Sequence, residues 1–60
     1  GRAEEFSEIL AYHFELAGEP QRTGRYAMLA GNRHLRVFAA EEAIEWFDRA
    51  MDAAVVVGTN

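Results

Sequence analysis

The sequence predicts an all-α fold of three helices, an antiparallel helical hairpin followed by one further helix, on the strength of three observations. Apolar residues recur with the period of an α-helix along three segments. Gly18 and Pro20 separate the first two segments in the order that ends one helix and begins the next. A second break suits residues 38–40. We therefore expect helices over about residues 3–17, 20–38 and 40–56, in a single domain of 60 residues.

The first predicted helix is amphipathic, with an apolar face of about 160° opposite a row of glutamates. That face comprises Phe6, Ile9, Leu10, His13, Phe14, Leu16 and Ala17. Gly18 suits the left-handed residue that follows a helix, and Pro20 suits the first turn of the next one. We therefore expect a tight turn between two antiparallel helices.

The middle predicted helix has an apolar arc of roughly 200°, wider than one neighbouring helix needs, so it should be buried on two sides. Gly31-Asn32 is a possible stop, and periodicity alone also permits one helix running on through residue 55. We favour a helix that continues through Gly31, because the apolar face keeps its phase there. A close helix crossing would offset the cost of that glycine, about 1 kcal/mol relative to alanine.

The third predicted helix carries acids in its first turn, where they complement the helix dipole. Its apolar arc is again about 200° wide, so one neighbour cannot cover it. The arc comprises Ala40, Ala43, Ile44, Trp46, Phe47, Ala50, Met51, Ala54 and Val55.

The composition indicates more apolar residues than the core of a domain this small can bury. Half of the residues are hydrophobic, whereas a domain of this size buries only about 60% of the surface that its unfolded chain exposes. With no cysteine, disulfides and thiolate metal sites are excluded. No membrane-spanning run and no signal-peptide pattern is found, so we expect a cytoplasmic protein with no membrane partner. The start at Gly1 rather than Met suits a piece of a longer chain.

Charge is segregated along the sequence. Residues 1–18 carry one Arg and four Glu (−3), residues 19–38 four Arg and one Glu (+3), and residues 39–60 one Arg and five acids (−4). Successive antiparallel helices would then pair opposite charges. The net charge of −4 argues against a general nucleic-acid-binding protein.

The polar side of the middle helix is the first candidate for a binding surface. It consists of an arginine stripe with one leucine among the charges, namely Arg22, Arg25, Leu29, Arg33 and Arg36. One interpretation is salt bridges to the acidic helices on either side together with solvation. The other is docking of an acidic partner segment, with Leu29 as the apolar contact.

Large aromatic side chains supply the second candidate. Tyr12 and Trp46 lie at or beyond the edges of their apolar faces, and aromatic residues at such an edge are common anchors in interfaces. We expect Trp46, with Ala50 and Ala53 beside it, to form the surface that receives another helix or another copy.

Neither catalytic nor metal-binding residues are predicted. His13 and His34 lack a second ligand three or four residues away, so we expect them to be hydrogen-bonded core histidines. The acidic stripe on the third helix consists of Glu41, Glu45, Asp48 and Asp52. Arg49 lies at ion-pairing distance along the helix, and no cleft separates the pKa values of these acids. No glycine-rich phosphate loop is present, and we expect no cofactor.

A resemblance to a known family involves the last two helices. Residues 39–53, AAEEAIEWFDRAMDA, resemble the second helix of a tetratricopeptide repeat, and Ala43, Phe47 and Ala50 match its alanine, aromatic and alanine positions. Gly31 stands where that repeat places a small residue for close helix contact. His34 replaces the usual tyrosine and Phe38 the usual turn glycine.

The resemblance extends over about residues 8–54. LAYHFELAGEP looks like the end of a repeat's first helix with its turn at Gly18, and the helix that follows has Thr23 and Gly24 where alanine and an aliphatic residue are usual. The chain is most similar to the degenerate repeats downstream of ATPase modules in large bacterial signalling proteins, including nucleotide-cyclase fusions and transcription regulators. The resemblance implies a tetratricopeptide-like fragment of an α-α superhelix that binds protein without chemistry of its own.

The function expected from the sequence is therefore a protein–protein interaction or assembly module. Its partner would be another copy, neighbouring repeats or an acidic or amphipathic helix, because a repeat unit cannot cover its own apolar face. The alternative is a regulatory fragment of a multidomain bacterial ATPase, nucleotide cyclase or transcription regulator. A small nucleic-acid-binding helical domain is the third interpretation, disfavoured by the net charge.

Overall fold

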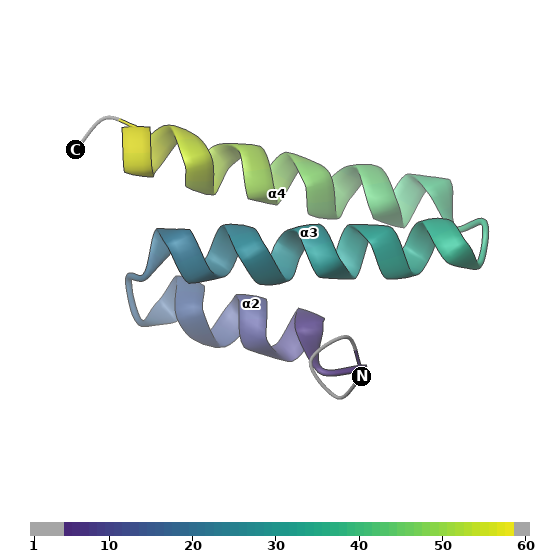
Figure 1. Cartoon of the computed structure of the whole chain (residues 1–60), viewed down its shortest axis with the longest axis horizontal. Coiled ribbons are helices and arrows are strands. Elements are labelled where there is room, and N and C mark those ends of the chain that lie inside the picture. The colour runs from purple at the N-terminus through teal and green to yellow at the C-terminus, as the bar shows by residue number, and fades with distance from the viewer. Residues whose placement is uncertain (1–4, 59–60) are drawn as a thin grey trace.

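Three helices and no strand make up the part of the chain that the computed structural model describes, residues 5–58. They are α2 (Ser7–Leu16), α3 (Pro20–Arg36) and α4 (Ala40–Gly58), drawn in Figure 1. The predicted all-α class is confirmed. α3 ends two residues before the predicted position and α4 continues two residues beyond it. The predicted start of the first helix, residue 3, lies outside the described residues.

The turn between α2 and α3 forms as the sequence predicts. Gly18 has a φ of 73°, the left-handed conformation that glycine adopts without steric cost. Its N–H donates to the carbonyl oxygen of Glu15 at 3.1 Å, and the N–H of Glu19 donates to that of Phe14 at 2.9 Å. Pro20 then begins α3. The two helices are therefore antiparallel neighbours.

α3 continues through Gly31-Asn32 without a break, so the prediction of an uninterrupted middle helix is confirmed. It ends in a turn that uses an unusual residue. Phe38 adopts a φ of 59°, which side chains with a Cβ rarely adopt. The N–H of Phe38 donates to the carbonyl oxygen of Leu35 at 3.0 Å, and the N–H of Ala39 donates to that of His34 at 2.8 Å.

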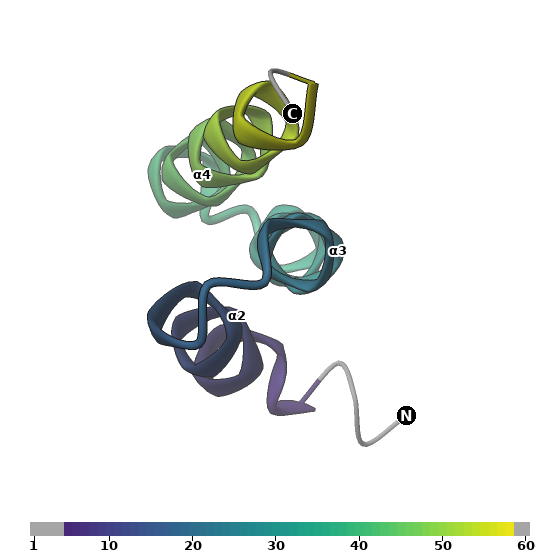
Figure 2. The same cartoon turned by 90° about the vertical axis from the view of Figure 1, so that its left-hand side faces the viewer.

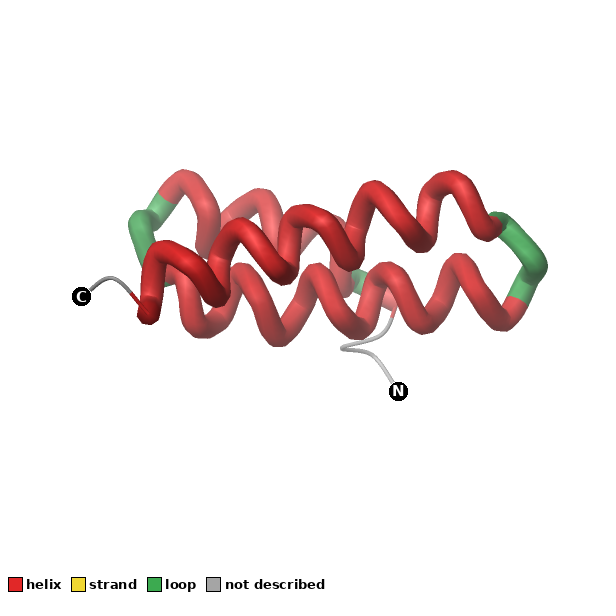
Figure 3. Tube along the Cα trace, turned by 90° about the horizontal axis from the view of Figure 1, so that it is seen from above, coloured by secondary structure: helices red, strands yellow, loops and turns green. Residues whose placement is uncertain are grey.

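The middle helix contacts both of its neighbours, as its wide apolar arc predicts. In the view along the helices, α2 and α4 lie on the same side of α3, one below and one above (Figure 2). Seen from above, α3 and α4 run antiparallel along their length, and the turn that joins them extends beyond the end of α2 (Figure 3). We call the side of α3 on which both α2 and α4 lie the angled side of the fold.

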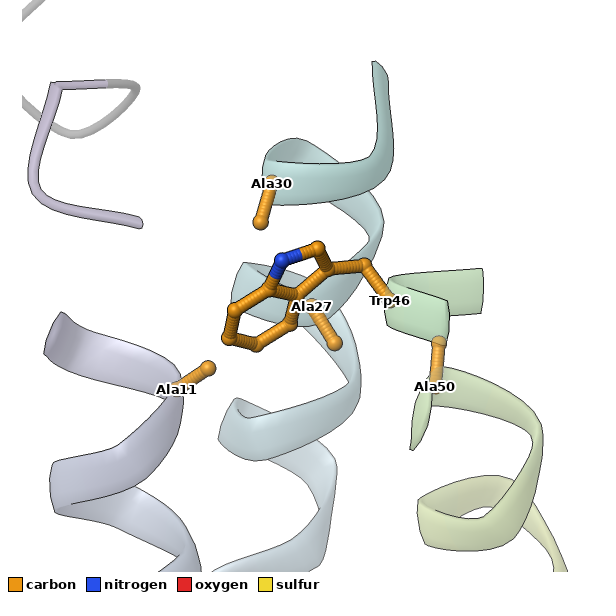
Figure 4. Close-up of a cluster of buried hydrophobic side chains, with 5 residues drawn as sticks. All are labelled: Ala11, Ala27, Ala30, Trp46 and Ala50. Carbon is orange, nitrogen blue, oxygen red and sulfur yellow. The ribbon is translucent and has the colours of Figure 1, made fainter. Parts of the chain in front are cut away.

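The core is built from small side chains around one large ring. Among the described residues, the buried apolar set is Ala11, Ala27, Ala30, Ala43, Trp46, Ala50 and Ala53. The indole of Trp46 extends from α4 toward Ala11 of α2, beside Ala27 and Ala30 of α3 (Figure 4). Alanines allow the helix axes to approach closely, and the indole fills the space that remains between the three helices.

The predicted apolar face of the first helix is only partly correct. Ser7 and Ala11 are the residues of α2 that become buried, whereas Ile9 is 65% and Leu16 91% exposed. The close packing of α2 on α3 selects small side chains for the contact and turns these larger ones outward. Phe14 keeps the predicted inward position, where its ring stacks on Tyr26 of α3 at 5.5 Å.

Candidate interaction surface

The arginine stripe of α3 is divided in the structure, because two of its members are turned toward α2. Arg33 donates from its guanidinium to the backbone oxygen of Glu5 at 2.8 Å. Arg22 lies 3.5 Å from the carboxylate of Glu19 and places its guanidinium 5.3 Å from the centre of the Phe14 ring. Both contacts hold the first hairpin together, which is the structural interpretation of these two arginines.

The other members of the stripe have different surroundings. Arg25 and Arg36 are exposed and Leu29 is half-buried. Arg25 borders a groove between α3 and α4, and with 100° of rotation per residue it lies about 60° around α3 from Arg22 and about 80° from Arg33. The stripe therefore stays on one side of α3, with Arg22 and Arg33 engaged toward α2 and Arg25 beside the groove.

Trp46, Ala50 and Ala53 are core residues, and their predicted role as an open surface is wrong. Trp46 is 6% exposed, and each of the two alanines 7%. The predicted apolar arc of the third helix is wide enough to contact a neighbour on either of two sides. Periodicity places Trp46 at the edge of this arc but does not show which side of the helix faces the core. The position of α2 decides this, since it closes the space into which the indole projects.

Tyr12 packs against the indole of Trp46 and is itself partly exposed. Its ring meets the ring of Trp46 edge-on, with centroids 5.5 Å apart, while 46% of the residue remains accessible. Arg49 lies over both rings, at 4.8 Å from the Tyr12 centroid and 4.9 Å from that of Trp46. It also approaches the carboxylate of Glu15 at 3.8 Å. Arg49 thus joins α4 to α2 instead of pairing along α4 as the sequence predicts.

The two histidines differ in their surroundings. His34 is half-buried, with Nε2 3.2 Å from Oε2 of Glu8 across the first hairpin. His13 is exposed and its ring lies edge-on to Phe14, so the prediction that it is a core residue is wrong. Within residues 5–58 there is no group of three or more histidine, cysteine or acidic side chains placed to hold a metal ion. The acidic stripe of α4 is exposed.

Large apolar side chains form an exposed face across α3 and α4, and its α4 residues belong to the wide apolar arc predicted for the third helix. Large side chains from both α3 and α4 lie on it with about half or more of their surface accessible. We define this α3/α4 face as Met28 (47%), Leu35 (49%), Ile44 (59%), Met51 (67%) and Val55 (63%). The seven-residue spacing of Met28 to Leu35 and of Ile44 to Met51, two helical turns in each case, could have revealed it.

Part of the α3/α4 face is hollowed into a groove with a volume of about 520 Å³. Met28 and Met51 lie on its walls, Gly24 and Ala50 lie in its lining, and Arg25 is the charged residue at its edge. A second groove of about 310 Å³ lies on the angled side, between Glu15 and Arg49. The first groove is the more apolar, as its lining residues show.

Comparisons with protein-family models, with curated proteins and with solved structures returned no match to this chain. Across the described helices, none combines the length and the apolar character needed to cross a membrane.

Proposed function

We propose that this chain is a protein-association module whose α3/α4 face binds an amphipathic helix. One observation carries the proposal: most of the large apolar side chains lie outside, and the buried ones are mainly alanines. Twelve large hydrophobic residues among those described are at least 46% exposed, whereas the buried apolar residues are six alanines and one tryptophan. Exposed apolar surface of this extent is typical of binding sites.

The arrangement of α3 and α4 supports a helical-repeat module of the tetratricopeptide kind. Gly31 lies under the ring of Phe47, and the resemblance places a small residue at this position for close helix contact. Ala43 and Ala50 are buried at the alanine positions. In stacked helical repeats each unit covers the apolar face of its neighbour, and the α3/α4 face has the position and composition that such stacking requires. We assign the module no reaction of its own.

The binding mode that fits this face is a helix lying in a groove. Met28 and Met51 offer flexible, polarisable side chains that adapt to a partner's shape. Arg25 at the groove edge favours a partner helix with acidic residues beside its apolar ones. The proposed partner is therefore amphipathic and acidic.

A synthetic amphipathic helix with a leucine face and a glutamate face is the probe that tests this function. Titrated into methyl-labelled protein, it should shift the NMR signals of Met28, Leu35, Ile44 and Met51 more than that of Leu16 on α2. A matched peptide with lysine in place of glutamate should bind more weakly. Shifts confined to α2, or no binding at all, would show that the α3/α4 face is not the site.

A further inference from the structure

We propose that the natural occupant of the α3/α4 face is a second copy of this chain, related by a two-fold axis parallel to α3 and α4. The proposal rests on the proposed function, because it uses the same surface, and it identifies the partner. Three properties of the face support it: the charges at its two edges, the register of α3 against α4, and its size.

The two edges of the α3/α4 face carry opposite charge. With 100° of rotation per residue, Arg25 and Arg36 lie about 60–100° around α3 from Met28 and Leu35, on the side away from α4 and beyond Gln21 and Asn32. By the same rotation, Glu41 and Asp48 border the apolar row of α4 on the side away from α3. All four are exposed. The face is therefore an apolar strip with an arginine edge along one helix and an acidic edge along the other.

A surface of this kind complements its own copy in one orientation. When two copies stack face to face, the two-fold axis lies in the plane between them. An axis parallel to the helices places α3 of each copy over α4 of the other, so each arginine edge meets an acidic edge. An axis perpendicular to the helices places α3 over α3, so arginine edges and acidic edges meet their own kind. Juxtaposed like charges disfavour the second arrangement, which selects the parallel axis.

The parallel axis also fixes the register, because a pure rotation about it allows no sliding along the helices. Within one copy, Gly31 lies level with Phe47, and Gly24 with Ala53. Because the rotation leaves each residue's position along the axis unchanged, residues that are level within one copy are also level between the two copies. Glu41 then lies level with Arg36 of the other copy, and Asp48 lies between its Arg25 and its Arg36. The apolar rows meet at the same levels, Leu35 opposite Ile44 and Met28 close to Met51.

The size of the face suits a stable dimer. A specific interface buries about 800 Å² on each partner, roughly a fifth of the 4391 Å² that this chain exposes. Two packed helices about 20 Å wide and about 25 Å long have a footprint on the order of 500 Å² before side-chain relief is added. The resulting four-helix layer covers the large residues that the alanine core leaves outside.

Sedimentation equilibrium of the chain is the first test. The monomer has a mass of 6.7 kDa, and we expect the mass to rise with concentration to twice that value and then to stay constant. The variant Ile44→Glu/Met51→Glu should remain a monomer. A wild-type chain that is a monomer at every concentration would overturn the second-copy proposal, while binding of the acidic peptide helix would still uphold the proposed function. A mass that rises without limit would show head-to-tail stacking instead.

The orientation is tested with two charge variants. Arg25→Glu/Arg36→Glu has two acidic edges and Glu41→Arg/Asp48→Arg has two arginine edges, so each should be a monomer alone. Mixed in equal amounts they should form a heterodimer, since every edge then meets its opposite. The control is Glu42→Arg/Glu45→Arg, which makes the same charge change on exposed positions away from the face and should still dimerise. Variants that dimerise alone as well as the control would overturn the parallel axis.

An independent measurement uses no variant. In a mixture of differently labelled wild-type chains, isotope-filtered NMR should show contacts between the Leu35 methyls of one copy and the Ile44 methyls of the other. Contacts between the two copies of Leu35 would place α3 over α3 and contradict the proposed axis. Circular dichroism of each charge variant confirms that its helices are retained.

Discussion

Gly31 of α3 lies directly beneath the ring of Phe47 of α4, so close that a Cβ on residue 31 would stand 2.5 Å from Cε1 and 2.7 Å from Cδ1 of that ring. Real Cβ atoms do not approach other carbons at such distances, so glycine is required there by space rather than by backbone conformation. This contact explains why a glycine is tolerated within a long helix, and it sets the separation of α3 from α4.

Replacing that glycine should therefore destabilise the fold. Gly31→Ala gains about 1 kcal/mol of helix propensity but forces the Phe47 ring out of place, and overpacking of this kind costs about 1–3 kcal/mol. We expect a net loss of about 1 kcal/mol in unfolding free energy. Thermal unfolding followed by circular dichroism, at one fixed protein concentration, measures it.

Gly24→Ala is the matched control for that change. A Cβ on Gly24 would meet the Cβ of Ala53 at 3.6 Å, an ordinary contact, so this variant should gain up to about 1 kcal/mol from helix propensity alone. Adding Phe47→Leu to Gly31→Ala should recover part of the loss. Equal stabilisation by both glycine substitutions would contradict the close contact with Phe47.

Phe38 occupies a position better suited to glycine. Its φ is 59° and its side chain is 93% exposed, so the ring adds little packing to offset the strained backbone. The left-handed conformation costs a residue with a Cβ about 1–2 kcal/mol, and glycine loses about 0.5–1 kcal/mol in chain entropy. Phe38→Gly should therefore raise the unfolding free energy by roughly 0.5–1 kcal/mol, measured by urea unfolding.

Gly18 provides the reverse comparison. Its φ is 73° and a Cβ on it would meet open space, so Gly18→Ala isolates the backbone strain. We expect a net loss of about 0.5–1 kcal/mol, because the smaller chain entropy that alanine loses offsets part of the strain of about 1–2 kcal/mol. If Phe38→Gly lowers stability instead, the phenylalanine ring must contact something that offsets the strain.

Trp46 is the only tryptophan of the chain, so its fluorescence reports on the core directly. Because the residue is 6% exposed, acrylamide should quench its emission weakly in the folded protein and strongly in urea. Trp46→Ala should cost about 3–5 kcal/mol, comparable to the whole stability that a core of this size supplies. We therefore expect that variant to be largely unfolded, with Trp46→Phe losing less. Equal quenching of the folded and the urea-unfolded protein would show that Trp46 lies on the surface and not in the core.

The local features of this fold follow from the sequence. The number of helices, the turn at Gly18, the start of α3 at Pro20 and its passage through Gly31 all depend on interactions within a few residues. Backbone preference and helical periodicity determine such features, because they act along the chain. The charge segregation and the excess of apolar residues are likewise visible without a structure.

The rotation of each helix about its own axis is what only the tertiary structure decided. Apolar arcs of roughly 200° on the second and third helices contain more than one direction that the core could take, and periodicity does not choose between them. The choice comes from contacts between distant residues: Phe47 on Gly31, and the indole of Trp46 against alanines of α2 and α3. Because close helix contact favours small side chains, those contacts bury the alanines and leave Ile9, Leu16 and the α3/α4 face outside.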